Sequence, residues 1–188
     1  MIGPWKASTT SAKRKVDFIM KIFKVNENAE IPSFATSGSA AFDLKACLEA
    51  NTKIRAYNPH NREMEIPVKP TGDGRLAVTL HPQFRTLVPT GLIFDIPEKH
   101  VLKLFIRSSM ALKYSLSLAN GTGIIDSDYV DPTFMMVVNN GDTPILIYNG
   151  DRVAQGILEK TVKYVLEETT EKPQKKTERD GGLGSTGI

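Results

Sequence analysis

Residues 120–129 (Asn-Gly-Thr-Gly-Ile-Ile-Asp-Ser-Asp-Tyr) hold the densest group of chemically useful side chains in this sequence. The two glycines accept positive φ at little cost, so the Asn-Gly and Thr-Gly pairs predict the tip of a β-hairpin. Two isoleucines then begin a strand, and Asp126, Asp128 and Tyr129 follow it. Backbone groups at such a tip have fixed spacing, and a carboxylate at the strand end can be held against a substrate. A surface hairpin with a solvated acidic turn is the alternative.

A second group lies at residues 107–114 (RSSMALKY), where Arg107 precedes the clearest helix of the sequence. Met, Ala and Leu favour a helix, and Ser108 or Ser109 can cap its N-terminus. Helix amides, two hydroxyls and a guanidinium in one place form a sound anion site. The alternative is an ordinary N-cap beside a solvated arginine.

Residues 152–158 (RVAQGIL) alternate polar and apolar side chains. In a strand, this pattern predicts that Arg152 shares a face with Ala154, while Val153 shares one with Gln155. A buried Arg or Gln needs a partner, which either the fold or a ligand would supply.

The chain ends in a polar segment, residues 167–188, whose last eight residues contain four glycines. Because this segment has little to bury, we expect it to be mobile when nothing is bound. Its backbone amides, together with Arg179, Ser185 and Thr186, could wrap a polyphosphate. A featureless flexible end is the alternative.

The elements that must position these groups are predicted to be short strands separated by turns that contain proline. This pattern is typical of a β-sandwich or β-barrel. Asp43 interrupts an apolar run at 40–44, and an edge-strand aspartate that caps a turn is its plainest structural explanation. The predicted strands are residues 18–25, 76–80, two pieces of 84–97, 100–106, 133–138, 145–148 and 161–166.

Residues 51–74 contain three prolines and two glycines. Most connections are about 4–6 residues long, so we interpret this segment as an insertion at the surface and leave its secondary structure open. Residues 1–17 are polar and rich in Ser, Thr and Lys, which indicates a flexible extension or a remnant of cloning. The predicted domain therefore spans residues 18–166.

Composition limits the classes of protein that fit. A length of 188 residues suits one domain with a substantial core, and 40% hydrophobic and 24% charged residues are those of an ordinary globule. The single cysteine, Cys47, excludes an internal disulfide framework and fits a reducing compartment. No apolar run approaches the ~20 residues of a membrane span, so we expect no membrane partner.

The net charge of +3 does not indicate a nucleic-acid partner. Of 24 basic and 21 acidic residues, four basic and one acidic lie in residues 1–17, which leaves 20 of each sign in the remainder. Because binding to a nucleic-acid backbone requires a basic excess, we expect no nucleic-acid partner.

Taken in order, five motifs resemble those of the trimeric dUTPase family, which hydrolyses dUTP to dUMP and pyrophosphate. They are SAAFDL (39–44), RSSMALKY (107–114), NGTGIIDSDYV (120–130), GDRVAQGIL (150–158) and RDGGLGSTG (179–187). The resemblance implies a jelly-roll-like β-barrel and a homotrimer whose active sites draw on more than one subunit. It also implies Mg²⁺, held mainly by substrate phosphates and water, and a cytoplasmic location (the host cytoplasm for a viral protein).

The resemblance further implies roles for individual residues. Asp126 would activate the attacking water, Tyr129 would pack on deoxyribose, and Asp43 would have a supporting role. Uracil would be read by the turn that contains Asn120, Gly123 and Ile124. The other substrate-binding residues would be Arg107, Ser108, Ser109 and Gln155 at the phosphates, with Arg179, Leu183, Gly184, Ser185 and Thr186 in the closing tail.

Three departures from the family pattern indicate a divergent branch, for which a viral source is one reading. Leu183 stands where an aromatic residue commonly stacks on uracil, which removes a stacking contribution of ~1–3 kcal/mol. Residues 130–132 (Val-Asp-Pro) follow Tyr129 in place of Arg-Gly. Ile106 precedes the arginine of the second motif in place of Pro or Ala.

Three other functions need to be separated from dUTP hydrolysis. A dCTP deaminase shares the fold and the Arg-Ser-Ser motif, but it needs a glutamate in the strand after the third motif, and residues 133–138 contain no acid. A protein-binding regulator that uses nucleotide as a switch would contact its protein partner through residues 51–74. Generic anion binding on a β-barrel, without catalysis, is the third.

Overall fold

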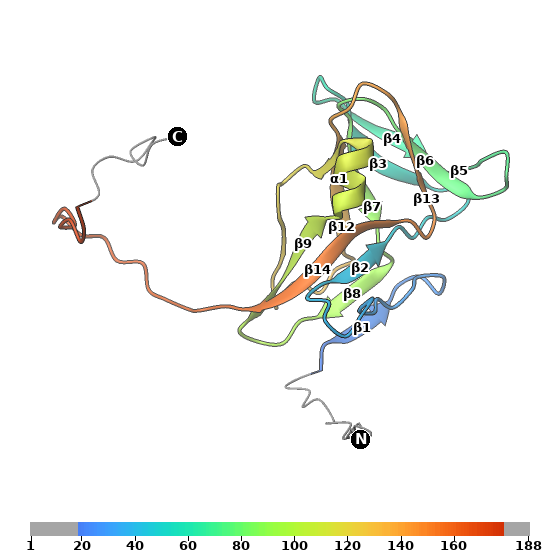
Figure 1. The fold of residues 1–188 in the computed structure, drawn as a ribbon. Coiled ribbons are helices and arrows are strands. Elements are labelled where there is room, and N and C mark those ends of the chain that lie inside the picture. The colour runs from blue at the N-terminus through green and yellow to red at the C-terminus, as the bar shows by residue number, and fades with distance from the viewer. Residues whose placement is uncertain (1–18, 179–188) are drawn as a thin grey trace, which may run out of the picture.

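The computed structural model describes residues 19–178 and confirms the all-β fold class. This range contains fourteen strands and one short helix (Figure 1). The strands are β1 (Lys21–Lys24), β2 (Phe42–Lys45), β3 (Lys53–Tyr57), β4 (Glu63–Pro67), β5 (Lys69–Pro70), β6 (Leu76–Leu80), β7 (Arg85–Pro89), β8 (Leu92–Asp95), β9 (His100–Ile106), β10 (Leu116–Leu118), β11 (Gly123–Ile125), β12 (Phe134–Asn139), β13 (Ile145–Tyr148) and β14 (Arg152–Lys160). The helix, α1, spans Ser108–Tyr114 as predicted.

Two sheets form most of the jelly-roll-like barrel. The five-stranded sheet has the order β10-β12-β7-β3-β4, and the four-stranded sheet has the order β11-β9-β14-β2. A three-stranded sheet, β13-β6-β5, and the pair β1-β8 complete it. All of these strand pairs are antiparallel.

The hydrophobic core lies between the inner faces of these sheets. Met135 and Val137 of β12 are fully buried, while Met136 between them is 41% exposed, which is the period-two pattern of a strand with one solvated face. Leu102 and Leu104 of β9 contribute from the four-stranded sheet. Each such side chain contributes about 1.5–3 kcal/mol of burial free energy, so the four-stranded sheet is firmly backed by the core.

The structure does not agree with the interpretation of residues 51–74 as a surface insertion, because these residues supply three strands of the barrel. β3 pairs with both β4 and β7 inside the five-stranded sheet. The alternation within β3 and β4 turns apolar side chains inward. Pro59 falls in the turn between these two strands, and Pro67 and Pro70 fall on the edge strands β4 and β5, where a missing amide is tolerated. The buried side chains of this segment are Ile54, Ala56, Ile66 and Val68.

The strand predicted at residues 161–166 is wrong for the single chain. β14 ends at Lys160, and the chain then runs away from the barrel (Figure 1). A strand needs an edge to pair with, and residues 161–166 have no strand partner within residues 19–178. The side chains of Val162, Tyr164, Val165 and Leu166 are 76–90% exposed.

Across the described range, the structure contains no helix with the length and apolar character needed to cross a membrane.

Candidate functional site

Asp43, Phe105 and Gln155 lie side by side on the outer face of the four-stranded sheet. The register sets Gln155 of β14 opposite Asp43 of β2 on one side and opposite Phe105 of β9 on the other. Directly opposed residues project from the same face of a sheet, and all three are partly exposed. Arg107 follows Phe105 by two positions, so the predicted phosphate-binding residues meet at one end of this face.

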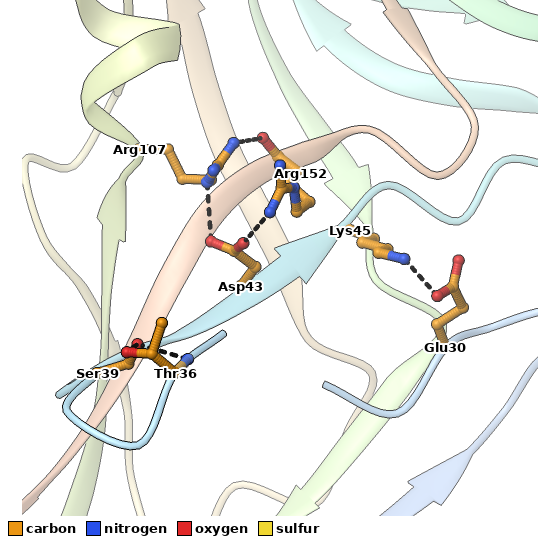
Figure 2. A network of polar contacts seen from close by, with 7 residues as sticks. All are labelled: Glu30, Thr36, Ser39, Asp43, Lys45, Arg107 and Arg152. Atoms are coloured by element: carbon orange, nitrogen blue, oxygen red, sulfur yellow. Dashed lines mark hydrogen bonds and ion pairs between the residues drawn. The ribbon is translucent and has the colours of Figure 1, made fainter. Parts of the chain in front are cut away.

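Asp43 binds two arginines at this end of the sheet (Figure 2). The Nε atom of Arg107 lies 2.8 Å from Oδ1 of Asp43, and Nη1 of Arg152 lies 3.0 Å from Oδ2. The side chains of Asp43 and Arg107 are 21% and 23% exposed, and that of Arg152 is 52% exposed. Asp43 does lie on an edge strand, but its carboxylate pairs with arginines and does not cap a turn. One carboxylate between two guanidiniums leaves an excess of positive charge, which favours an anion.

A β-bulge in β14 turns Arg152 onto this outer face. The predicted alternation is wrong, because the register against β2 shifts between Arg152 and Ala154. Val153 and Ala154 are consecutive, yet both are fully buried. A bulge adds one residue and thereby reverses the side that the preceding residues face. Sequence reasoning therefore missed Arg152 as a site residue, and the two adjacent apolar residues after it were the available signal.

The helix α1 begins where predicted, but no serine caps it. Arg107 is the N-cap, with φ −72° and ψ 140°, and no side chain binds the first amides, so the prediction that Ser108 or Ser109 caps the helix is wrong. Both serines lie in the first turn of the helix instead. Ser109 lines a groove of about 900 Å³ together with Arg107 and Arg152. The arginines of the Asp43 cluster therefore open onto a groove large enough for an anionic ligand.

The turn at residues 119–122 joins two sheets and not the two strands of one hairpin. β10 pairs with β12 in the five-stranded sheet, whereas β11 pairs with β9 in the four-stranded sheet. The hairpin prediction is therefore wrong, because β10 and β11 do not pair with each other. β10 pairs with the edge of β12, and β11 pairs with the edge of β9. The turn conformation is as predicted: Gly121 has φ +71°, and its N–H donates to the carbonyl of Leu118 at 3.0 Å.

Gly123 brings the backbone of β11 close against β9. A Cβ at Gly123 would lie 3.0 Å from the Cβ of Leu104, which is closer than side chains normally pack. Ile124 is 52% exposed, and Asn120 is exposed at the turn. The buried glycine thus fixes the backbone of a strand whose outer groups face solvent.

Asp126 and Tyr129 lie in a short turn that follows β11. The N–H of Tyr129 donates to the carbonyl of Asp126 at 3.1 Å, and the Tyr129 hydroxyl donates to the carbonyl of Pro132 at 3.1 Å. The Asp126 carboxylate is exposed, and Tyr129 is 38% exposed. The carboxylate and the ring are therefore both accessible to a ligand.

Asp126 lies near the start of β9, whereas Arg107 and Gln155 lie near its end. Ile125 lies opposite Leu102, five positions before Arg107. At about 3.3 Å per residue, Ile125 and Arg107 are roughly 17 Å apart. Asp126 and Arg107 of one chain therefore lie in well-separated parts of this sheet. The predicted tail residues Arg179, Leu183, Gly184, Ser185 and Thr186 lie outside the described residues.

The side chains around Asp43 do not form a metal site of their own. Residues 19–178 contain no group of three or more His, Cys, Asp or Glu side chains that could hold a metal ion. Both carboxylate oxygens of Asp43 are engaged by arginines. A Mg²⁺ ion at this place would have to keep several waters and take its other ligands from a bound phosphate group.

The fold is a β-barrel, and its site is a carboxylate held between two arginines beside an open groove. The dUTPase family model matches residues 74–187. The deoxyuridine 5'-triphosphate nucleotidohydrolase of Treponema denticola is 33% identical over 171 residues, which cover 90% of this chain and 99% of that protein. The chain belongs to the dUTPase family.

Two solved phage structures share the fold. The match to a variant of the phage 80alpha dUTPase covers 90% of this chain and 99% of the phage chain, with a TM-score of 0.66 and 19% identity. The phage protein has both an enzymatic activity and a SaPI-inducing capacity. The dUTPase of phage phi11 of S. aureus covers 84% of this chain and all of its own, with a TM-score of 0.63 and 18% identity, and coordinates a structural Mg(II) ion. At these identities, the likeness extends to the fold alone.

Proposed function

We propose that this protein hydrolyses dUTP to dUMP and pyrophosphate, which limits uracil incorporation into DNA and supplies dUMP for thymidylate synthesis. One observation carries the proposal. The chain belongs to the dUTPase family and retains the motif residues Asp126, Tyr129 and Gln155. The arginine cluster around Asp43 supports it, since a triphosphate needs cationic partners.

Uracil recognition is assigned to the turn from Asn120 to Ile124. Uracil presents an acceptor, a donor and an acceptor at O4, N3–H and O2, and backbone groups at fixed spacing can complement this pattern. The tight packing of Gly123 on Leu104 supports a fixed position for that backbone. Cytosine reverses two of the three positions, and each mispaired buried group costs ~1–3 kcal/mol. Thymine has the same pattern, so its methyl group must be excluded by shape.

The sugar and the reacting water are assigned to Tyr129 and Asp126. The hydrogen bond from the Tyr129 hydroxyl to Pro132 orients a ring that is open on its exposed side, where a deoxyribose can pack and a 2′-hydroxyl is excluded. Asp126 holds one water in line with the phosphate chain and accepts its proton as general base.

The phosphates are assigned to Arg107, Ser108, Ser109 and Gln155, with Arg179, Leu183, Gly184, Ser185 and Thr186 closing over the nucleotide. Mg²⁺, held by phosphate oxygens and water, would neutralise charge on the leaving pyrophosphate. The two arginines at Asp43 act on the same charge from the protein side.

A complete site needs groups from more than one copy of the chain, and we assign a homotrimer. The separation of roughly 17 Å along β9 supports this assignment, because one nucleotide must meet both the Arg107 end and the Asp126 end. The exposed apolar side chains of residues 161–166 support it independently, since a second copy could cover them.

The test is pyrophosphate release from dUTP, dTTP, dCTP and UTP, each with Mg²⁺ and with a chelator. We expect release from dUTP in the presence of Mg²⁺ and at least ~100-fold less from the other three. Release from dTTP or UTP at the rate of dUTP would contradict the proposal, and full activity with the chelator would remove Mg²⁺ from it.

A second function, regulation through a bound protein, is favoured by the likeness to phage 80alpha dUTPase, which has an inducing capacity besides its activity. Residues 51–74 would supply the contact, because β4 is the edge of the five-stranded sheet and can accept a further strand. An Asp126→Ala variant that loses hydrolysis but keeps every effect in the cell would favour this function.

A further inference from the structure

Tyr129 can exclude a 2′-hydroxyl only if its ring is held in one position, and the hydroxyl of this ring donates to the carbonyl of Pro132. We propose that Thr90, a buried residue between β7 and β8, is the positioning residue that holds Pro132 and thereby the Tyr129 ring. Thr90 then sets how strongly the site discriminates deoxyribose from ribose. The nucleotide as ligand rests on the proposed function, whereas the positioning of the ring does not.

The segment that contains Pro132 needs an anchor from another part of the chain. Residues 130–132 belong to no strand, and Val130 is 70% exposed. The ring of Pro132 fixes its own φ at about −65° but leaves it without an amide hydrogen to donate. The direction of the Pro132 carbonyl therefore depends on where the next residue, Thr133, is held.

The peptide group that joins Pro132 to Thr133 is bonded on both sides. Its carbonyl accepts from the Tyr129 hydroxyl at 3.1 Å, and its N–H donates to the carbonyl of Leu92 at 2.9 Å. A peptide group is planar, with its C=O and N–H on opposite sides. The carbonyl of Leu92 therefore fixes the orientation of the carbonyl that Tyr129 uses.

Thr90 joins the two segments that meet at this peptide group. It is 2% exposed. Its hydroxyl donates to the carbonyl of Thr133 at 2.7 Å and accepts from the N–H of Leu92 at 3.2 Å. Its backbone N–H donates to the same Thr133 carbonyl at 3.2 Å. One buried hydroxyl thus holds Leu92 and Thr133 in the arrangement that orients Pro132.

The turn that contains Thr90 is packed firmly against the core. Gly91 has φ +69°, and a Cβ at this position would lie 2.8 Å from both the Cβ of Ala29 and the Sγ of Cys47. Because the backbone is in such close contact with buried side chains, the turn has little room to move. Thr90 therefore connects the Tyr129 segment to a rigid part of the barrel.

Thr133 provides a matched control for the hydroxyl of Thr90. Thr133 is 1% exposed, and its Oγ1 atom has no hydrogen-bond partner among the described residues. The two threonines are therefore alike in size and burial, but only the hydroxyl of Thr90 bonds to the backbone that orients Pro132. Valine keeps the branched shape of threonine and removes the hydroxyl, so the same substitution at both positions separates the hydrogen bonds from the packing.

The experiment measures kcat/KM for dUTP and for UTP in the wild-type protein, Thr90→Val, Thr90→Ser and Thr133→Val. We expect the ratio of the dUTP value to the UTP value to fall about tenfold in Thr90→Val, because a ring that can shift no longer excludes the 2′-hydroxyl. Thr90→Ser keeps the hydroxyl and should keep most of the ratio, and Thr133→Val should leave it unchanged. A purely structural role of Thr90 would lower the melting temperature and both kcat/KM values together, without changing their ratio.

Tyr129→Phe tests the same connection from its other end and does not depend on whether Thr90→Val folds. It keeps the ring and removes the hydroxyl, so the ratio should fall here too. In the double variant with Thr90→Val the ratio should fall no further, since both changes break one series of contacts. An unchanged ratio in Thr90→Val or in Tyr129→Phe would overturn the proposal.

The NMR chemical shift of the Tyr129 ring carbon that bears the hydroxyl reports the position of the ring without nucleotide. We expect it to change in Thr90→Val and to stay the same in Thr133→Val; the same shift in Thr90→Val and wild type would overturn the proposal. A Thr90-dependent shift in a protein that does not turn over dUTP would refute the proposed function and leave Thr90 as the residue that positions Tyr129.

Discussion

Asp126 and Arg107 lie toward opposite ends of strand β9: Asp126 follows the neighbouring strand β11, and Arg107 is the N-cap of α1 just after β9. Ile125, which precedes Asp126, lies opposite Leu102, and Arg107 follows Ile106 at the end of β9. The four-stranded sheet thus holds Asp126 at one end, and the arginine cluster together with the turn at residues 119–122 at the other. In an assembly of identical chains, Asp126 of one copy can lie close to Arg107 of a neighbouring copy.

Replacing Asp126 by Asn should lower kcat for dUTP by about 10²–10⁴-fold while nucleotide binding is retained. The amide keeps the size of the side chain but cannot accept a proton from water. Steady-state kinetics and calorimetry with a non-hydrolysable dUTP analogue give the two quantities. Asp128→Asn is the matched control, two residues away and without an assigned role, and should retain kcat. Equal kcat values in the wild type and Asp126→Asn would contradict the assignment of Asp126 as the general base.

Replacing Gly123 by Ala should raise the KM for dUTP and lower the melting temperature. The added methyl group would lie 3.0 Å from Cβ of Leu104 and push β11 away from β9, a kind of overpacking that costs about 1–3 kcal/mol. Gly38→Ala is the control, since no atom lies within 4 Å of a Cβ there. Unchanged KM and melting temperature in Gly123→Ala would show that the backbone here has room to move.

The carboxyl group of Asp73 should titrate well below its usual range. Hydrogen bonds from Thr71 and then Arg75 lower its pKa from 3.8 to about 2. A lowered pKa means that this carboxylate stabilises the β5–β6 turn above pH 3.8, and that the contribution is lost as the pH falls toward 2. The side-chain carboxyl chemical shift of Asp73, followed by NMR, gives the midpoint. Thr71→Val should move it toward 3.8, and an unchanged midpoint would mean that Arg75 alone sets it.

Removal of residues 179–188 should greatly reduce kcat/KM for dUTP and leave the oligomer intact. These residues carry the amides, hydroxyls and Arg179 that would close over the phosphates, whereas the barrel ends before them. Kinetics and sedimentation of the truncated protein measure both effects. Normal kinetics would make Leu183 and its neighbours dispensable.

Sequence reasoning located the helix from local composition, and it named Asp43, Arg107 and Gln155 from the order of the family motifs. Residues 108–114 form the predicted helix, and Asp43, Arg107 and Gln155 meet at one end of one sheet. Residues 100–106 and 133–138, which were predicted as strands, form β9 and β12. The helix and the strands depend on neighbours along the chain, which a sequence displays directly, whereas the meeting of the three residues follows from strand pairing.

The features that sequence reasoning missed depend on partners far along the chain. The bulge that exposes Arg152 arises in the pairing of β14 with β2, more than 100 residues away. The separate sheets of β10 and β11 follow from edges offered by β12 and β9. Residues 161–166 have an apolar strand pattern but find no partner strand among the described residues of their own chain.

The most direct test of a site shared between copies is complementation of two inactive variants. Asp126→Asn and Arg107→Ala are produced separately and then unfolded and refolded together, with mixed assembly verified by mass spectrometry. Each variant alone should be nearly inactive with dUTP. In random mixed trimers, about a quarter of the sites combine an intact Asp126 with an intact Arg107 from another copy, so pyrophosphate release should return to about that fraction of wild type. Mixed trimers that form but release no pyrophosphate would contradict a site built between copies.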